Sequence, residues 1–382
     1  MSPDFKIPHG KTSQVQAVPR QSAIPDPRND LKPWMLKVVN GERLSDIEAI
    51  GLFGEDLTTL ARYATIVRDR LHDRHATFIA DLNLNLTNVC SCDCGFCAFK
   101  RLPDAKDAFV LDSESVLARV RALHAVGGTQ VLMQGGINDA LGIDYYTALL
   151  RTIRQEFPDI TIHSFSPPEI SGLAKKHGMS VREVLETLRT AGLDSLPGGG
   201  AEILVDNVRH KMSPKKIKAA EWLAVMRTAH ELGMPTTATM MFGALETQAD
   251  RIGHLSAIRH LQDETKGFRA FIPWTFSPEK TKFAGVIKAG GAEYLKTLAI
   301  CRLYLDNIPN LGSGWLTEGM PVAQLGLLCG ANDMGGILME EKVIESTGLS
   351  HRTNIEDLVN AIRGAGYLPA RRDSAYKILE EY

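Results

Sequence analysis

From about residue 78 onward, strand-like and helix-like hydrophobic patterns alternate along the chain. Leu82, Leu84 and Leu86 are separated by polar residues, which is the period of a half-buried strand. A helical apolar stripe follows at 113–126, and a short apolar run at 130–136 then stops at two glycines. Strands that are separated by helices in this way pair in parallel through right-handed crossovers. The pattern therefore predicts an α/β fold.

The alternation continues until eight strands have been counted. Their natural closure is a (β/α)8 barrel of the TIM type, which accommodates 382 residues as one unit. An open doubly wound sheet is the alternative, but no Gly-x-Gly-x-x-Gly turn follows the first strand. The further strands are predicted at 160–166, 193–196, 236–242, 268–276, 311–315 and 331–333. The further helices are predicted at 144–157, 180–191, from Ser213-Pro214 onward, between the fifth and sixth strands, and at 291–305 and 322–329.

Composition divides the chain into four parts. Six of the 18 prolines lie in the first forty residues, so residues 1–43 are expected to form an extended polar arm. Residues 44–77 have helical spacing and form a helical preface. Residues 78–340 form the barrel, and 341–382 are expected to form a C-terminal helical segment that packs on it.

The overall charge and hydropathy exclude several classes of partner. Lys plus Arg number 43 and Asp plus Glu number 45, for a net charge of −2, so nothing favours nucleic acid or a membrane surface. No apolar run approaches the ~18 residues of a membrane span. The first residues also lack the apolar stretch of a secretory signal. A cytoplasmic protein is expected.

Four of the six cysteines fall within eight positions, directly after the first predicted strand. Cys90, Cys94 and Cys97 have C-x3-C-x2-C spacing, so three thiolates on one loop can hold three corners of a 4Fe–4S cluster. The fourth iron then keeps an open coordination position, as catalytic metals do. Structural zinc and thiol redox chemistry are the alternatives, but no second ligand pair for zinc follows downstream. Cys92 competes as a ligand, although a bystander role is favoured, and Cys301 and Cys329 are interpreted as core packing.

Further candidate residues lie where the predicted strands end, because barrel active sites form at those carboxyl ends. Gln134, Gly135 and Gly136 offer backbone that a ligand can approach closely, and Asn138 follows them. At each site an ordinary structural role, such as a turn, a core residue or a helix start, is the alternative. The other candidates are His163, Ser164 and Glu169 at the end of the third strand, Glu202 after Gly198-Gly199-Gly200, Trp274 in the sixth strand, and Asn332 and Asp333 in the eighth.

The loop Cys90–Phe99 resembles the C-x3-C-x-Phe-C signature of radical S-adenosylmethionine enzymes. The resemblance implies that the methionine amino and carboxylate groups of S-adenosylmethionine bind the open iron, and that one-electron reduction gives a 5′-deoxyadenosyl radical. It implies cosubstrate contacts for Phe96, Gln134, Gly135, Gly136, Ser166 and Glu202. A cytosolic one-electron reductant such as flavodoxin or ferredoxin is the implied protein partner.

From about residue 44 to the C-terminus, the chain resembles the branch of this family that contains dehypoxanthine futalosine cyclase, aminofutalosine synthase and the deazaflavin FO synthase subunits. Ser195–Gly200, Phe271–Phe276 and Gly330–Asp333 look most like the cyclase, which implies menaquinone biosynthesis by the futalosine route. The radical would take hydrogen from the ribose C4′ of dehypoxanthine futalosine, and the ring would then close.

In the implied cyclase chemistry, His163, Glu169 and Glu202 are candidates for removing the final proton, and the sequence does not choose among them. Asn138, Ser164, Trp274, Asn332 and Asp333 would contact the substrate. Leu86, Cys92 and Ala244 depart from the pattern of the branch, where a tyrosine is expected at position 86 and a histidine at 244. A sister reaction of the branch is the near alternative, and a non-catalytic iron–sulfur electron carrier is the alternative from another class.

Overall fold

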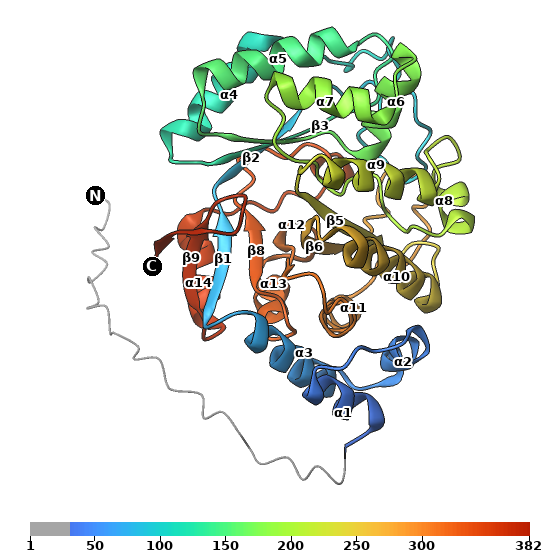
Figure 1. The fold of residues 1–382 in the computed structure, drawn as a ribbon, viewed down its shortest axis with the longest axis vertical. Helices are drawn as coiled ribbons and strands as arrows, with labels where there is room; N and C mark the ends of the chain where they lie inside the picture. Colours follow the sequence, from blue (N-terminus) through green and yellow to red (C-terminus); the bar gives the residue numbers. More distant parts are fainter. Residues whose placement is uncertain (1–30) are drawn as a thin grey trace, which may run out of the picture.

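The computed structural model describes residues 31–382, and helices surround its strands on the outside (Figure 1). Residues 1–30 of the expected arm lie outside the described residues. The helices are α1 (Pro33–Asn40), α2 (Asp46–Gly51), η2 (Leu52–Gly54), α3 (Leu57–Leu71), α4 (Ser113–Ala125), α5 (Ile143–Glu156), α6 (Pro167–His177), α7 (Val181–Ala191), α8 (Asp206–Met212), α9 (Ala219–Glu231), α10 (Gln248–Thr265), α11 (Gly291–Tyr304), α12 (Trp315–Glu318), α13 (Met320–Leu327), η3 (Glu345–Thr347) and α14 (Ile355–Gly364).

The strands pair in parallel around a closed ring, apart from one antiparallel pair at the C-terminus. They are β1 (His75–Ile79), β2 (Asp81–Asn85), β3 (Gln130–Gln134), β4 (Thr161–Ser164), β5 (Thr236–Phe242), β6 (Phe268–Thr275), β7 (Asn310–Leu311), β8 (Asp333–Gly336), β9 (Leu368–Arg372) and β10 (Ile378–Glu381). β2 pairs with β3 and β3 with β4, while β5 pairs with β6 and β6 with β7. β1 pairs with β8.

Two short connections close this ring. The segment at Ser195 and Leu196 is too short to form a regular strand, but it bridges in parallel to His163 of β4 and to Thr236 of β5. Gly312 likewise bridges from the end of β7 to β8. The first barrel strand is bent, so its first half, β1, contacts β8 and its second half, β2, contacts β3. The predicted barrel is therefore confirmed.

Local signals explain where several of the helices begin and end. A capping box begins α7, since Ser180 and Glu183 satisfy each other's backbone N–H groups. The prediction of a helix starting at Ser213-Pro214 is wrong, because Ser213 caps the end of α8 and α9 begins only at Ala219. Proline is common just after a helix end because it cannot continue the helix.

Both ends of the described chain pack on the barrel. α1 occupies Pro33–Asn40, where an extended arm was expected through residue 43. α3 of the helical preface packs against α11. The segment 341–382, expected to be helical, also contains β9, which pairs in parallel with β1, and β10, which pairs with β9. The period-two pattern of these strands is too short to stand out in the sequence.

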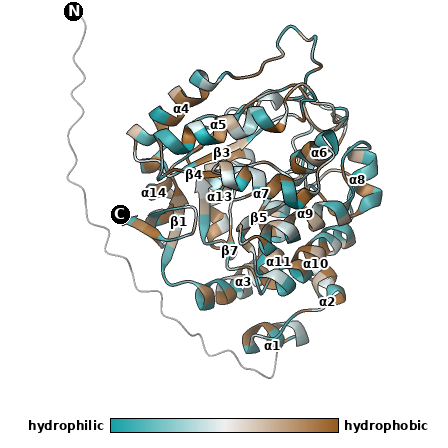
Figure 2. Cartoon of the chain, turned by 45° about the horizontal axis from the view of Figure 1, so that its top comes forward, coloured by the Kyte–Doolittle hydropathy of each residue, from teal (hydrophilic) through white to brown (hydrophobic). Residues whose placement is uncertain are grey.

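The core lies between the strands and the inner faces of the helices. In Figure 2, the helices carry hydrophilic and hydrophobic patches side by side, as expected for elements with one apolar face. Cys301 and Cys329 are buried in this core, as the sequence indicated. Among residues 31–382, no helix is long and apolar enough to cross a bilayer.

Candidate active site

The cysteine loop follows β2 at the carboxyl end of the barrel strands, and its backbone is held from both sides. Cys90 N–H donates to the carbonyl of Arg101 at 3.2 Å, and Ser91 N–H donates to the carbonyl of Ile137 at 2.8 Å. Gly95 N–H donates to the carbonyl of Met212 at 2.8 Å. The loop therefore has a fixed place between the β3–α5 connection and the end of α8.

The sulfur atoms differ in environment. Cys90, Cys94 and Cys97 are partly exposed, whereas Cys92 is only 8% exposed. Hydrogen bonds from the Cys92 thiol lower the pKa of Cys90 and of Cys94 to about 6, and the same bonds raise the pKa of Cys92. Burial raises the pKa of Cys97. Thiolates are the ligands of iron–sulfur clusters, so Cys90 and Cys94 are the thiols most ready to ligate.

Within residues 31–382, no group of three His, Cys, Asp or Glu side chains has the arrangement of a metal site. The donor chemistry nevertheless fits a cluster, because three of these thiols share one short loop. The Ile137 N–H also donates to Cys90 Sγ at 3.3 Å, a contact that stabilises a thiolate there.

Two glycines at the end of β3 pack directly on this loop. A Cβ on Gly136 would lie 2.1 Å from the carbonyl oxygen of Val89 and 2.9 Å from Cys90 Cβ. One on Gly135 would lie 3.3 Å from the backbone of Thr87. Only glycine allows this close approach, and it leaves a cradle of bare backbone beside the cysteines.

Glu169 fastens the same strand end. Its carboxylate accepts the Gly135 N–H at 3.2 Å, the Ser166 N–H at 2.7 Å and the Ser166 hydroxyl at 2.6 Å. Burial raises its pKa to about 7, although these hydrogen bonds oppose the shift. The structure thus places Glu169 and Ser166 beside the glycine cradle, where the carboxyl group fixes the start of α6 and the end of β3 together.

The three consecutive glycines after the fourth barrel strand are each in close contact with neighbours or in a backbone conformation that favours glycine. Gly198 lies between the hydroxyls of Thr237 and Thr239, and its Cβ would lie 2.8 Å from three backbone atoms of β5. On Gly199, a Cβ would lie 2.2 Å from Gln134 Nε2. Gly200 has a φ of 75°, which side chains rarely adopt. These contacts bring Gln134 and the glycine loop together at the mouth.

A charged group that the sequence did not reveal lies beside the cysteine loop. Lys216 Nζ is 3.0 Å from Glu202 Oε1 and 5.0 Å from the centroid of the Phe96 ring. Burial lowers the pKa of Lys216, but the charges of Glu202 and Cys94 outweigh it and raise the pKa overall. Arg209 lies 3.8 Å from the other Glu202 oxygen. Lys216 lies in an irregular segment with no periodic pattern, so no sequence signal marked it.

His163 lies deeper in the barrel than predicted. Its Nδ1 is 2.7 Å from Ser195 Oγ and 3.1 Å from Arg269 Nη2. Because Arg269 is the second residue of β6, this cluster lies toward the amino-terminal ends of the strands, away from the cysteine loop. Burial holds the pKa of His163 well below its usual value. The His163 ring is therefore hydrogen-bonded to protein side chains inside the barrel and does not line the mouth.

The side chains of Asn332 and Asp333 also form hydrogen bonds with other protein side chains. Asn332 Oδ1 accepts from Arg302 at 2.9 Å, and Asp333 accepts from Arg372 at 2.5 and 2.8 Å. The eighth strand was predicted to end at 333, but β8 begins there. These residues therefore lie at the wrong end of the strand to contact a substrate at the mouth.

The three remaining candidates differ in how open they are. Trp274 is the last but one residue of β6, at the carboxyl end, and is only partly buried. Ser164 is buried and donates to the carbonyl of Met133 at 2.8 Å. Asn138 is buried, and its Oδ1 accepts the Ala140 N–H at 3.0 Å. Of these three, Trp274 has the side chain best placed to contact a substrate.

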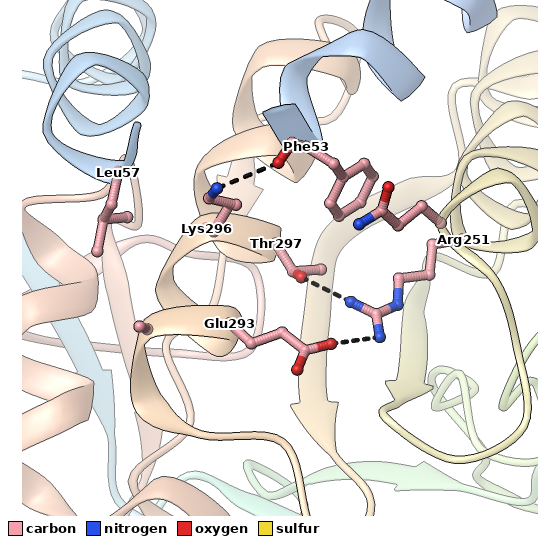
Figure 3. A pocket seen from close by; sticks show the side chains of 8 residues that line it. Phe53, Leu57, Arg251, Glu293, Lys296 and Thr297 are labelled. Atoms are coloured by element: carbon pink, nitrogen blue, oxygen red, sulfur yellow. Dashed lines mark hydrogen bonds and ion pairs between the residues drawn. The ribbon is translucent and has the colours of Figure 1, made fainter. Parts of the chain in front are cut away.

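A pocket of about 410 Å³ lies elsewhere, between the helical preface and helices α10 and α11 (Figure 3). Arg251, in its wall, hydrogen-bonds to Glu293 and Thr297 and forms an ion pair with Glu246 at 2.9 Å. Glu246 in turn accepts the Gly243 N–H at 2.6 Å. The pocket thus contacts the outside of the barrel, and its wall braces the loop after β5.

Two family models match the chain. The Radical SAM superfamily matches residues 84–258, and the CofH/MqnC C-terminal region matches residues 265–381. The cyclic dehypoxanthine futalosine synthase of Halalkalibacterium halodurans is 44% identical, covering 91% of this chain and 94% of that protein. That of Streptomyces coelicolor is 40% identical, covering 92% and 89%. The aminodeoxyfutalosine synthase of Thermus thermophilus is 37% identical, covering 93% and 96%.

Solved structures agree on the fold. Methylornithine synthase (PylB) superposes with a TM-score of 0.72 at 19% identity, covering 88% of this chain and 97% of that one. The hydrogenase maturase HydG from Carboxydothermus hydrogenoformans also gives 0.72 at 19% identity, covering 90% and 79%. With its cysteine loop, its barrel and relatives matched along nearly their whole length, the chain belongs to the radical S-adenosylmethionine superfamily, in the group that carries the CofH/MqnC C-terminal region.

Proposed function

We propose that this chain is an enzyme that cyclises dehypoxanthine futalosine to cyclic dehypoxanthine futalosine in menaquinone biosynthesis. The observation that carries the proposal is the cysteine loop beside a glycine cradle, in a chain 44% identical to a cyclic dehypoxanthine futalosine synthase. Cys90, Cys94 and Cys97 would hold a 4Fe–4S cluster with one open iron. The cluster, when bound, supplies the electron that cleaves S-adenosylmethionine and so starts the radical reaction.

The protein's own residues would position the cosubstrate. Gly135 and Gly136 present bare backbone next to Cys90, where carbonyl groups can accept hydrogen bonds from an ammonium group. Glu202 lies close enough to Cys94 for its charge to act on that thiol, and Lys216 pairs with it at 3.0 Å. Phe96 presents a ring face to Lys216, with 5.0 Å between Nζ and the ring centroid. A radical attacks nearby C–H bonds, so this enclosure serves to fix the target hydrogen and exclude water.

The final proton removal calls for a base near the mouth. Of the three residues predicted for it, Glu169 and Glu202 lie around the cysteine loop, while His163 lies among Ser195 and Arg269. The pKa of Glu169, raised to about 7, suits a group that accepts and returns a proton near neutral pH. Glu169 and Glu202 are therefore the two candidates for this role, with Trp274 as the substrate-facing aromatic residue.

Ala244 favours a sister reaction of the same branch as a second candidate function. Where the branch is expected to have a histidine, this chain has Ala244, whose side chain is a methyl group. The backbone N–H of Ala244 donates to the Glu246 carboxylate at 3.0 Å. A missing imidazole would alter how the mouth recognises its substrate. Both candidate reactions use the same cluster and cosubstrate.

One anaerobic experiment tests the assignment. The reconstituted protein is incubated with dithionite, S-adenosylmethionine and dehypoxanthine futalosine, and the products are followed by mass spectrometry. Cyclised product with one 5′-deoxyadenosine released per turnover is expected. Deoxyadenosine release without cyclised product would favour the sister reaction, and protein that binds no iron would refute both. The matched control is Cys94→Ala.

The electron donor and cellular location complete the proposal. All six cysteines are free thiols, which suits a reducing compartment, and we place the enzyme in the cytoplasm. A one-electron donor such as flavodoxin or ferredoxin would reduce the cluster there.

A further inference from the structure

We infer that the surface around the cysteine loop is the docking site for an acidic one-electron donor protein. The inference rests on the proposed function, because only a redox cluster at this position needs an electron from outside. The relevant surface, here called the basic face, consists of the exposed ends of the cysteine loop, the end of α8 and the loop between β6 and α11. Its cations are Lys100, Arg101, Lys211, Lys215 and Lys282.

The packing holds the outer cations next to the cysteines. Lys282 N–H donates to the carbonyl of Gly95 at 2.8 Å, and a Cβ on Gly95 would lie 2.8 Å from the ring of Phe283. On the other side, Gly95 N–H donates to the carbonyl of Met212, which fixes the end of α8 that carries Lys211. The three segments therefore form one continuous surface whose centre is the cysteine loop.

This face has more positive than negative charge, although the whole chain has a net charge of −2. Its carboxylates are Asp93, which pairs with Lys100 at 3.2 Å and Lys282 at 3.1 Å, and Asp107, which pairs with Arg101. Two further acidic residues nearby, Asp104 and Glu279, are each followed closely by a lysine, Lys106 and Lys280. These four residues add no net charge to the face. Lys211 and Lys215 are exposed and form no ion pair with a described residue. Asp139 borders the face, since its carboxylate accepts the Ser91 hydroxyl at 3.4 Å. With it, five cations face three carboxylates, and at least two of the cations are available to a partner.

Exposed apolar side chains on the same face point to a protein partner. Among residues 31–382, the three most exposed large hydrophobic side chains are Ile287 at 92%, Ile47 at 83% and Leu102 at 61%. Ile287 lies on the β6–α11 loop and Leu102 follows Arg101, so two of the three border the basic face. Protein interfaces combine apolar contacts with a charged rim, and opposite charge steers the partner into place. An acidic flavin or iron–sulfur protein fits this chemistry.

The test compares two electron sources. The double variant Lys211→Glu/Lys215→Glu reverses two unpaired cations without changing any residue assigned to cofactor or substrate. The control, Lys266→Glu/Lys377→Glu, makes the same change in net charge at exposed lysines away from this face: Lys266 follows α10 just before the amino-terminal end of β6, and Lys377 lies between β9 and β10. S-adenosylmethionine cleavage is driven either by a purified acidic flavodoxin with its reductase or by dithionite. Binding of oxidised flavodoxin is measured separately by surface plasmon resonance.

With flavodoxin in 50 mM salt, we expect the test variant to raise KM and the binding Kd about 10-fold. The difference should shrink to about 2-fold in 0.5 M salt, where charges are screened over a few ångströms. Dithionite-driven cleavage should equal wild type in both variants. Equal flavodoxin KM and Kd in the test and control variants would overturn the inference. If the wild-type protein does not cleave S-adenosylmethionine with dithionite, the proposed function is refuted, and this inference with it.

Discussion

The close contact between Gly136 and the cysteine loop predicts that Gly136→Ala displaces a cluster ligand. The added carbon would lie 2.1 Å from the Val89 carbonyl oxygen, where ordinary contact begins at 3.4 Å. Relief therefore requires a shift of about 1 Å, and because the obstacle is backbone, the segment at Cys90 must move. Overpacking of this kind costs about 1–3 kcal/mol of stability, and a 1 Å misplacement at a reacting centre costs about 100-fold in rate.

Two other glycines supply a graded comparison. A Cβ on Gly135 would lie 3.3 Å from its nearest neighbours, and one on Gly285 would have nothing within 4 Å. Iron content after anaerobic reconstitution, the paramagnetic resonance change on adding S-adenosylmethionine, and the cleavage rate are measured for all three alanine variants. The expected order of damage is Gly136, then Gly135, then Gly285 with none. If Gly136→Ala has the iron content of the wild type and a cleavage rate within 2-fold of the wild-type rate, this contact does not hold the cysteine loop in place.

Three further predictions concern the thiols and the buried charges. Cys94→Ala should lose the cluster and all cleavage, while Cys92→Ala keeps most of both; iron loss in Cys92→Ala would show that the ligand set is different. Arg372→Gln leaves the Asp333 carboxylate, which is 2% exposed, without its bidentate partner. The free energy of unfolding, measured in denaturant, should therefore fall by about 3–5 kcal/mol. Arg352→Gln, which breaks the exposed pair with Glu345, should lower it by about 0.5 kcal/mol or less. Burial raises the pKa of Asp81 from 3.8 to about 6, so ionising it in the folded state costs free energy, and wild-type stability should fall relative to Asp81→Asn as pH rises from about 4 to 6. Between pH 4 and pH 8 the difference should reach about 2–3 kcal/mol, and parallel pH profiles would contradict the assignment.

Elements with strong local periodicity were predictable. β5 was placed at 236–242, as the structure has it, because a buried strand and its flanking turns leave a clear pattern. α6 was missed because it begins at Pro167-Pro168, which resemble a turn, and α8 was missed because its 7 residues are too few for a helical period to stand out. The bend that divides the first strand into β1 and β2 was also missed, since it depends on two different neighbours, β8 and β3.

The residues around the cofactor were predicted unevenly. Glycines at strand ends marked the cradle, because the lack of a side chain is itself a sequence signal. Lys216 was missed although it lies 5.0 Å from the Phe96 ring, because an isolated lysine resembles any surface lysine. Asn332 and Asp333 were placed at the mouth because an error of a few residues in β8 exchanges one end of the strand for the other.

Order along the chain was enough to decide the chemistry that the protein carries: three thiols on one loop, with a strand before them and glycines after the next strand. Those features are local, so the covalent sequence determines them. Which groups face that loop was decided only by the closed ring of strands, which brings Gly136, Gly199, Glu202 and Lys216 together from distant positions. Close packing and the pairing of buried charges select these neighbours, and both depend on the three-dimensional arrangement of the whole barrel.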